Sequence, residues 1–568
     1  MDDLLAQRMR VGIGLGWRGC SYFEGLSMNV ECYPITVLPH VSQLYRDYLA
    51  MGESAADAAV RRWYGAEPFG GSWMHAGVLP VDAGRLADAL ERQSVEFGAG
   101  AAAMANIAKL RAGARAVVTG QQVGLLGGPL LTLLKAATAV ARAKQATVAT
   151  GVEHVPVFWL ATEDHDLAEV DQVSLLGKTR VETLRAGLTL DAAVPVGGVA
   201  IGPEIEAVLA QAEELLGYAP VCELLRECYA ARSGYSPTLG GAFARLMARV
   251  FAAQGLIVMD AGGREFHALG AGTLRYAIEH ADELDAALLV RTQELVEAGY
   301  HAQVLVTAGH SLLFLLDGQT GERAALRRLA EGEWKAAGKT YTTADLLGIL
   351  EAAPERISPN ALLRPVFQDT ILPTAAYIGG PAEVAYFAQS AVVYEAVVGR
   401  VTAVLPRLSA TLVEPAMATV MRRHEVSLPD AMTSAEALAL RLGARAMPIE
   451  GKRKLAAVGK AMDAELTALT EYMAAMDASL GRSAEVSGSK MRYQMNRLRR
   501  MAATFEVQKD ASLRKHAEAL TLHLFPGGHP QERVLGGVWF LARYGEGLVE
   551  RMVEAAENIC PGHMALEL

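Results

Sequence analysis

A pattern that repeats along the chain, a short apolar run followed by a glycine-rich turn and a helix, constrains the fold more than any other feature. In its first occurrence, residues 116–135, the run AVVT is followed by GQQVGLLGGP and an amphipathic segment. Similar apolar runs end in polar or glycine residues at 155–162, 255–263 and 374–383. Short buried strands that alternate with helices are typical of parallel βαβ units. The pattern therefore predicts an α/β fold built on a parallel sheet.

The first glycine-rich turn differs in spacing from both common phosphate-binding loops. Such loops bind anions because free backbone N–H groups and the helix dipole converge at a helix start. Here the glycines stand at 120, 124, 127 and 128, which matches neither G-x-G-x-x-G nor the P-loop pattern. Gly-Gly-Pro closes the turn at 127–129 and recurs at 379–381. Because proline suits the first position of a helix, both are predicted helix starts.

Two adjacent amides, Gln121 and Gln122, follow Gly120 directly after the first predicted strand. At the carboxyl end of a parallel strand, amides can donate hydrogen bonds to a polar substrate and accept them from it. We predict that Gly120, Gln121 and Gln122 bind substrate. The alternative is that the two amides only cap the turn.

Size and composition predict a globular protein of several parts that acts on small molecules. The chain has 568 residues, of which 51% are hydrophobic and 20% charged, and it exceeds the size at which one core stops growing. Its net charge of -10 argues against a nucleic-acid-binding surface, because phosphate neutralisation needs clustered Lys and Arg. The N-terminus lacks the plan of a signal peptide, and no apolar run reaches the roughly 18 residues of a membrane span. We expect a soluble, cytoplasmic protein with no nucleic-acid or membrane partner.

The cysteines are scattered and form neither a C-x-x-C pair nor a Cys/His metal pattern. Disulfides are rare in cytoplasmic proteins, so we expect reduced thiols. The five are Cys20, Cys32, Cys222, Cys228 and Cys560.

The strand-and-helix pattern is interrupted twice, which predicts a core that carries two insertions. The first insertion is predicted to be mostly helical, and the second to hold a small β element around 303–307 and 311–316. After the core, a helical arm and a C-terminal segment packed on the core are expected. The predicted boundaries are 1–171, 251–279 and 361–420 for the core with its N-terminal segment, 172–250 and 280–360 for the insertions, 421–520 for the arm, and 521–568 for the C-terminal segment.

The predicted arm has apolar residues at heptad spacing. Similar spacing resumes at 491–505 after a polar stretch, Gly481–Ser489, which predicts two long helices joined by a break into an antiparallel coiled coil. The alternative is two ordinary amphipathic helices packed on the body. The first seam consists of Leu455, Val458, Met462, Leu466, Leu469, Met473, Met476 and Leu480.

Four ionisable residues, 163–166, directly follow the second predicted strand. Doubly wound sheets place their sites at such strand ends. Neighbouring carboxylates raise the pKa of an imidazole, so we predict that His165 is a general base supported by Asp164 or Asp166. The cluster also suits a divalent metal, and one of the aspartates could instead cap a helix.

A third group of polar residues brackets the last predicted core strand. Arg364, with its planar guanidinium, suits a substrate carboxylate, and Gln368 and Asp369 follow it closely. Glu383 stands near the third position of the next helix, where the dipole favours a carboxylate. We predict that all four bind substrate, with helix capping as the alternative for Glu383.

A Pro/Gly loop follows the predicted arm at 524–533. Gly527 and Gly528 permit close approach of a ligand to the backbone, and Phe525 could stack on a base. The alternative is a simple chain reversal that docks the last helix.

Four motifs together resemble one family, the cysteine-adding enzymes (cysteine ligases) of bacillithiol biosynthesis. They are TGQQxGLxxGP at 119–129, WLATEDHD at 159–166, RPxxQD with YIGGPxE at 364–383, and LFPxG at 524–528. The resemblance covers the chain in order, more weakly in the first hundred residues and in both insertions.

The resemblance implies a Rossmann-like core related to class I nucleotidyltransferases, two connecting insertions, and a C-terminal coiled coil that forms a homodimer. It also implies that the carboxyl group of cysteine is joined to the glucosamine amine of glucosaminyl-malate, the last step of the pathway. An adenine nucleotide is implied near the helical region, and Phe525, Gly527 and Gly528 match that place. His-x-Gly-His is missing and Ser487–Met491 only weakly resembles a lysine loop, which puts a standard adenylation mechanism in doubt.

Amide formation from a carboxylate needs activation, so ATP is the expected driver, with ATP or ADP as the bound nucleotide. In this hypothesis Gln121 and Gln122 position the substrate, His165 takes a proton from the amine, and Arg364 holds a carboxylate. Two alternatives stay open. One is another nucleotidyl- or acyl-transferring enzyme of the same fold, and the other is a nucleotide-binding coiled-coil scaffold without turnover.

Overall fold

The structure is a computed structural model, and it divides the chain into two compact units. One unit consists of the chain up to Thr411 together with Glu532–Leu566. The other consists of Leu412–Gln531 together with the last two residues. Cys20 and His165 lie outside the described residues. The structure describes residues 29–51, 60–164, 166–190, 192–231, 237–329, 332–545 and 547–568.

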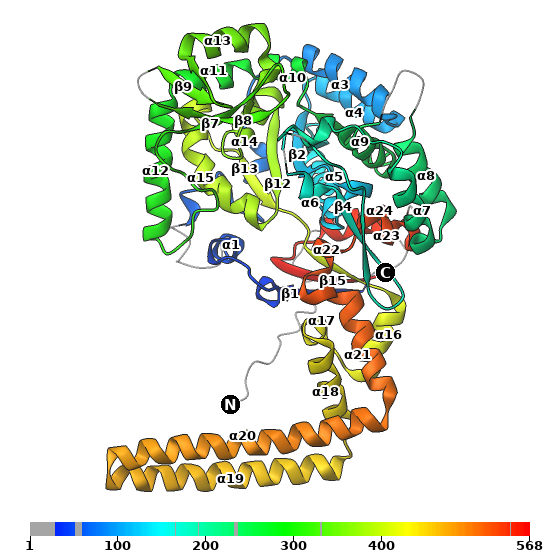
Figure 1. The fold of residues 1–568 in the computed structure, drawn as a ribbon, viewed down its shortest axis with the longest axis vertical. Helices are drawn as coiled ribbons and strands as arrows, with labels where there is room; N and C mark the ends of the chain where they lie inside the picture. The colour runs from blue at the N-terminus through cyan, green and yellow to red at the C-terminus, as the bar shows by residue number, and fades with distance from the viewer. Residues whose placement is uncertain are drawn as a thin grey trace. The chain divides into compact units, whose positions relative to one another are not determined.

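The first unit is built on a parallel sheet of five strands in the order β13-β12-β2-β3-β6, which confirms the predicted α/β, Rossmann-like core (Figure 1). Val118 of β2 is paired with Tyr377 of β12 on one side and with Val157 of β3 on the other. Parallel pairing brings the carboxyl ends of the strands to one edge. The strands are β2 (Arg115–Gln122), β3 (His154–Ala161), β6 (Ile257–Asp260), β12 (Thr374–Gly379) and β13 (Ala403–Pro406).

Both faces of the sheet are buried, as in other parallel sheets. Val117 of β2 packs in one apolar cluster with Ala139 and Ala143 of α5 (Leu131–Thr150). The next residue, Val118, belongs to a larger cluster on the opposite face that includes Phe387 of α15 (Pro381–Val398). This alternation follows from the two-residue period of a strand. The further helices of this part are α1 (Gln43–Leu49), α3 (Ala83–Phe97), α4 (Ala101–Arg111) and α14 (Arg364–Ile371).

The two Gly-Gly-Pro sequences have different roles. Pro381 is the first residue of α15, as predicted, and Glu383 completes a capping box there. Pro129 is not the first residue of α5, which begins at Leu131. Gly127 and Gly128 have positive φ angles of 86° and 67°, so the chain is still turning, and Pro129 forms a bridge with Gly536 before the helix begins.

The first insertion contains a two-stranded hairpin that the sequence analysis did not predict, in addition to its expected helices. The strands of the hairpin are β4 (Gln172–Leu176) and β5 (Val181–Arg185). The short helix α6 (Leu167–Val170) precedes them, and the helices of the insertion are α7 (Ile205–Leu216), α8 (Ala219–Tyr229) and α9 (Leu239–Val250).

The second insertion holds the predicted β element, which is larger than expected. His310–Leu316 is a strand, as predicted, but residues 303–307 are not. The five strands are ordered β10-β9-β8-β7-β11. They are β7 (His310–Leu316), β8 (Arg323–Arg328), β9 (Glu333–Ala336), β10 (Lys339–Thr342) and β11 (Ile357–Pro359), with helices α10 (Arg264–Leu269), α11 (Ala271–Glu279), α12 (Ala281–Glu297) and α13 (Thr343–Ala352) around them.

The second unit is helical and carries the predicted antiparallel pair of long helices, α19 (Ile449–Met476) and α20 (Ala478–Lys509), which lie side by side (Figure 1). The chain reverses at Asp477, whose carboxylate accepts hydrogen bonds from the backbone of Ser479 and Leu480. The predicted break, Gly481–Ser489, is instead part of α20. A Cβ atom on Gly481 would lie 2.7 Å from that of Ala474, so the glycine lets the helices approach rather than ending one. The other helices are α16 (Pro415–His424), α17 (Leu428–Ala431), α18 (Ala435–Ala446) and α21 (Ala511–Leu524).

The C-terminal segment returns to the first unit and forms the centre of a three-stranded sheet ordered β1-β15-β14. Its helices α23 and α24 follow α22 (Gln531–Val534). No helix among the described residues is both long and apolar enough to cross a membrane. The remaining bounds are β1 (Val30–Pro34), β14 (Ala410–Val413), β15 (Gly562–Glu567), α23 (Gly537–Tyr544) and α24 (Gly547–Glu557).

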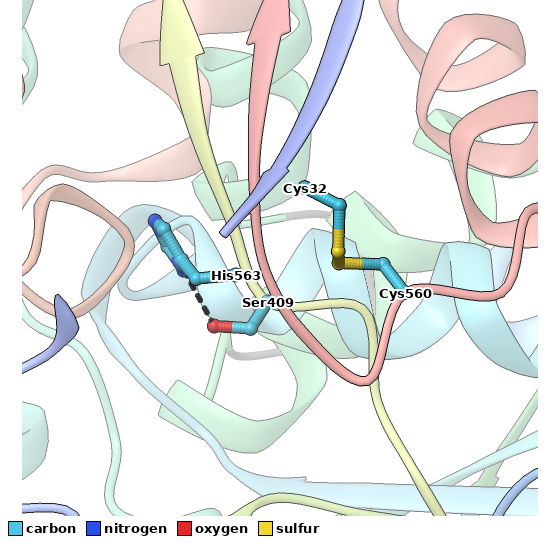
Figure 2. The surroundings of a disulfide bond; sticks show 4 residues. All are labelled: Cys32, Ser409, Cys560 and His563. Carbon is cyan, nitrogen blue, oxygen red and sulfur yellow. Dashed lines mark hydrogen bonds between the residues drawn. A yellow bond between two sulfur atoms is a disulfide. The ribbon is translucent and has the colours of Figure 1, made fainter. Parts of the chain in front are cut away.

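A disulfide joins Cys32 of β1 to Cys560, just before β15, with 5.9 Å between their Cα atoms (Figure 2). The expectation of reduced thiols is therefore wrong for this pair, whereas Cys222 and Cys228 are buried thiols that form no disulfide. The pairing of Pro34 with Gly562 brings together residues that are 528 positions apart. No local sequence pattern indicates such a contact.

Reduction of this disulfide is expected to destabilise the first unit, because the bond restricts the unfolded chain. The expected loss in the free energy of unfolding is about 2–5 kcal/mol. Thermal melts with and without a reducing agent measure it, and the Cys32→Ser variant should melt at the reduced temperature in both. Equal melting of the wild-type protein in both conditions would contradict the expectation.

Candidate active site

A cavity of about 700 Å³ opens at the carboxyl edge of the parallel sheet. Its walls come from the ends of β2, β3 and β12, the loop after β6, the start of α15, and the β7 and β8 strands of the second insertion. β2 lies between β12 and β3, which the chain reaches in opposite directions from it, so this is the topological switch point where open α/β sheets bind ligands. Of the predicted site residues, Gly120, Gln121, Gln122, Asp164, Arg364 and Glu383 line this cavity.

The two amides at the end of β2 form hydrogen bonds with charged side chains. Gln121 Oε1 accepts a hydrogen bond from Lys135 Nζ at 3.0 Å, and Gln122 Nε2 donates one to Asp164 Oδ2 at 2.5 Å. They therefore orient a cation and an anion on the cavity wall, which is more than the capping of a turn.

A buried ion pair between Lys135 and Glu383 lies at one end of the cavity. Lys135 Nζ is 2.6 Å from Glu383 Oε2, and the lysine is only 2% exposed. Burial lowers the pKa of Lys135, although Glu383 opposes this. Burial would raise the pKa of Glu383, but Lys135 and hydrogen bonds from the Gly380 N–H and the Tyr377 hydroxyl bring it below its usual value. The sequence analysis missed Lys135, a single cation in the apolar run of α5.

Three guanidinium groups line the same end of the cavity. Arg364 donates to the Tyr386 hydroxyl at 2.8 Å and to Gln368 Oε1 at 3.1 Å. Arg407 and Arg533 come from distant parts of the chain, and the sequence analysis missed both. Together with Lys135 they give this end an excess of positive charge, which suits a carboxylate or a phosphate.

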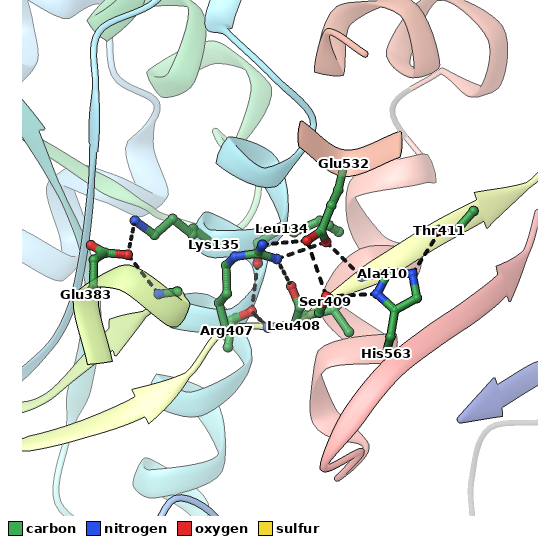
Figure 3. A network of polar contacts seen from close by, with 12 residues as sticks. Leu134, Lys135, Glu383, Arg407, Leu408, Ser409, Ala410, Thr411, Glu532 and His563 are labelled. Carbon is green, nitrogen blue, oxygen red and sulfur yellow. Dashed lines mark hydrogen bonds and ion pairs between the residues drawn. The ribbon is translucent and has the colours of Figure 1, made fainter. Parts of the chain in front are cut away.

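Arg407 is held by a buried carboxylate, Glu532 (Figure 3). The two side chains form a bidentate pair with N···O distances of 2.9 and 2.5 Å. Burial would raise the pKa of Glu532, but Arg407 lowers it to about 2. His563 bonds the hydroxyls of Ser409 and Thr411 beside this pair, and burial lowers its pKa to about 4.

The other end of the cavity is acidic and lies near the second insertion. Glu163 and Asp164 line it after β3, and Arg323 of β8 lies in the same wall. The guanidinium of Arg323 is 3.8 Å from the ring centre of Phe314 and donates to Ser358 and Pro359. Burial lowers its pKa, while Glu163 and Asp164 oppose the shift.

Gln368, Asp369 and Asp166 do not line the cavity. Gln368 and Asp369 are completely buried in α14, where Gln368 donates to Asp369 and accepts from Arg364. From this buried position Gln368 supports Arg364, and Asp369 supports Gln368. Asp166 caps α6, accepting from the Glu169 N–H at 3.2 Å, which is the helix-capping alternative of the sequence analysis.

The residues assigned to a nucleotide lie in the helical unit, after α21. Phe525 is 9% exposed, so its ring is buried, and the 3-10 turn Pro526–Gly528 follows it. A Cβ atom on Gly527 or Gly528 would meet nothing within 4 Å, which leaves their backbone as the open part of the loop. No group of His, Cys, Asp and Glu side chains suited to a metal ion occurs in the part of the chain that the structure describes.

Two family models match the chain. Residues 28–408 match the N-terminal Rossmann-like domain of bacillithiol biosynthesis BshC, and residues 410–568 match its C-terminal coiled-coil domain. Three similar proteins carry the name "Putative cysteine ligase BshC". That of Koribacter versatilis is 41% identical over 547 residues, which cover 95% of this chain and 100% of that protein. That of Solibacter usitatus is 35% identical, and the match covers 95% of this chain and 100% of that protein. That of Salinibacter ruber is 31% identical, and the match covers 94% of this chain and 97% of that protein.

Acid is expected to destabilise the fold through Glu532. Its folded pKa of about 2 lies below its ordinary value of 4.5, so the carboxylate stabilises the protein above that value and loses this effect as the pH falls toward 2. The shift corresponds to about 3 kcal/mol. Urea unfolding between pH 7 and 3 measures the loss.

The Glu532→Gln variant should be less stable at pH 7 by about 3–5 kcal/mol, because Arg407 stays buried without its partner. Between pH 4.5 and 3 it should also lose less stability than the wild type, because it lacks the Glu532 carboxylate. Glu557→Gln, at an exposed pair with Lys144, is the matched control. If the wild type and Glu532→Gln lose the same stability between pH 4.5 and 3, the role of Glu532 in acid unfolding is contradicted.

Proposed function

This chain belongs to the BshC family of bacillithiol biosynthesis, and from that premise we propose that it is a ligase that joins cysteine to glucosaminyl-malate in the last step of the pathway. The observation that carries the proposal is the separation of charge along the cavity. Of the charged groups that line it, Lys135, Arg364, Arg407 and Arg533 lie with Glu383 at one end, and Glu163 and Asp164 lie with Arg323 at the other. Cysteine is a zwitterion and glucosaminyl-malate carries two carboxylates and an amine, so a cavity with a basic and an acidic end suits both substrates.

The malyl carboxylates are assigned to the basic end. The guanidinium of Arg364 is held by Tyr386 and Gln368, and its planar fork suits bidentate binding of a carboxylate. Arg407 is held equally firmly by Glu532. Because their side chains are already ordered, little conformational entropy is lost when a ligand binds.

His165 is the proposed acceptor of a proton from the attacking amine. Asp164, which precedes it, lines the cavity and is oriented by Gln122, whereas Asp166 caps α6. Of the two aspartates proposed to support the base, Asp164 is therefore the better placed. Gln121 and Gln122 serve the substrate indirectly, by orienting Lys135 and Asp164.

ATP is the proposed source of the energy for amide formation, since a carboxylate does not react with an amine at neutral pH unless it is activated. The nucleotide is assigned to the loop of Phe525, Gly527 and Gly528 from the family resemblance, where the open backbone of the glycines supports close approach of a ligand. A divalent metal that accompanies the nucleotide is part of the same proposal.

Purified protein supplied with cysteine, glucosaminyl-malate and ATP is expected to form bacillithiol, detected by mass spectrometry, and to form none without nucleotide. His165→Ala should lose most of this activity, on the order of 100-fold or more, because general base catalysis contributes that much. His75→Ala, at an exposed histidine outside the cavity, is the control. If the wild-type protein forms no bacillithiol, the ligase proposal is overturned. If the His165→Ala variant stays active, the assignment of the base is overturned.

We also propose that the α19–α20 pair forms the interface of a homodimer. Within one chain the heptad seam is only partly covered, because Leu466 and Met473 are half-buried while Leu469 and Met476 are 53% and 63% exposed. Large apolar side chains of α20 are exposed as well, and contiguous patches of this kind commonly mark protein interfaces. They include Val486, Met491, Leu498, Met501 and Phe505.

Replacing exposed seam residues by charge should separate the dimer into monomers, since burying a charge in an apolar interface is costly. The test variant is Leu469→Glu with Leu498→Glu, and Lys460→Glu, at an exposed position of the same arm, is the control. Light scattering measures the mass in solution. A wild-type mass of one chain, or an unchanged mass for the double variant, would contradict the interface.

A further inference from the structure

Glu163, at the acidic end of the cavity, is paired with a histidine that the sequence analysis did not consider. His267 of α10 is completely buried, and its Nε2 lies 2.9 Å from Glu163 Oε1. Its ring packs 5.2 Å from that of Phe367, between ring centres. The glutamate itself reaches the cavity wall. A buried imidazole therefore stands directly behind a carboxylate that faces the ligand space.

The surroundings of His267 determine where its protons lie. Its Nδ1 is 3.0 Å from the backbone oxygen of Ile357, and a carbonyl oxygen only accepts, so Nδ1 carries a proton. On the other side Nε2 lies within ion-pair distance of the Glu163 carboxylate. Burial would lower the pKa of His267, but the charge of Glu163 and the backbone carbonyls raise it. The raised pKa favours the imidazolium form of His267.

The carboxylate of Glu163 is held in one orientation by its ion pair with His267 and faces the cavity. It is well suited to hold an ammonium group, and Asp164 in the same wall adds a second negative charge. Arg323, the cation nearest to them in the wall, already donates to Ser358 and Pro359.

The two substrates each bring an amino group, but only one of them must stay protonated. The amine of glucosaminyl-malate attacks the activated carboxyl carbon, so it loses one proton before the attack and a second as the amide forms. The α-amino group of cysteine must not attack, and two nearby carboxylates favour its ammonium form. The carboxylate of Glu163 thus suits the ammonium group of cysteine, whereas the amine of glucosaminyl-malate needs a base, the proposed role of His165.

We propose that Glu163 binds the α-ammonium group of the cysteine substrate, and that His267 is the positioning residue that holds the Glu163 carboxylate toward it. The proposal rests on the ligase function proposed above. It places the amino acid at the acidic end, with its carboxyl group directed to the centre of the cavity, and glucosaminyl-malate at the basic end.

Binding of two ligands, L-cysteine and 3-mercaptopropionate, tests the proposal. The second compound has the thiol and the carboxylate but no amino group. Glu163→Gln should weaken the binding of cysteine about 10- to 100-fold, as expected for loss of a hydrogen bond to a charged group, and should leave that of 3-mercaptopropionate unchanged within about twofold. Glu265→Gln, at an exposed ion pair with Arg92, is the matched control. Calorimetry measures both affinities without turnover, so the result does not depend on whether the ligation assay succeeds.

Steady-state kinetics and variants of His267 separate positioning from a general loss of structure. In Glu163→Gln, KM for cysteine should rise while KM for glucosaminyl-malate stays constant. His267→Gln, which keeps an N–H donor, should bind cysteine more tightly than His267→Ala, and both should keep the wild-type affinity for 3-mercaptopropionate. Equal weakening of both ligands by Glu163→Gln, or a rise in KM for glucosaminyl-malate alone, would overturn the proposal.

Discussion

The pairing of β2 with strands on both of its sides is the constraint on which the cavity depends. Its neighbours β3 and β12 both come later in the sequence, but they pair with opposite sides of β2, so their connections leave the edge of the sheet in opposite directions. The space between those connections is the cavity, and Gly120, Gln121 and Gln122 enter it because they are the last residues of β2. A shift of one residue in this pairing would turn the side chains of the strand to the opposite faces.

Buried ion pairs then determine the charge at each end of the cavity. In each of three pairs, a charged group of the cavity wall contacts a group of opposite charge. The pairs are Lys135 with Glu383, Arg407 with Glu532, and Glu163 with His267. Such pairs contribute little net stability, because the desolvation of both partners offsets their attraction. Their effect is to hold side chains in one orientation, and the groups that meet the ligand are thereby ordered before it binds.

Much of the fold was predictable because it depends on local patterns. The apolar runs of β2, β3, β6 and β12 predict buried parallel strands, and Pro381 and Glu383 mark a helix start that the structure confirms. The family resemblance from four motifs is confirmed by matches over both units. The turn at Asp477 was missed because Gly481 looked like a helix break, and only the approach of Ala474 explains that glycine.

The sequence by itself determined the class of fold, the family, and those site residues that stand at strand ends, because these follow from periodicity and adjacent motifs. The tertiary structure alone decided the rest of the site. Lys135, Arg407, Arg533 and His267 carry no local signal. Strand pairing and helix packing bring the first three to the cavity and His267 to Glu163 behind its wall. The Cys32–Cys560 disulfide has the same origin, since only the pairing of β1 with β15 places its two thiols in reach of each other.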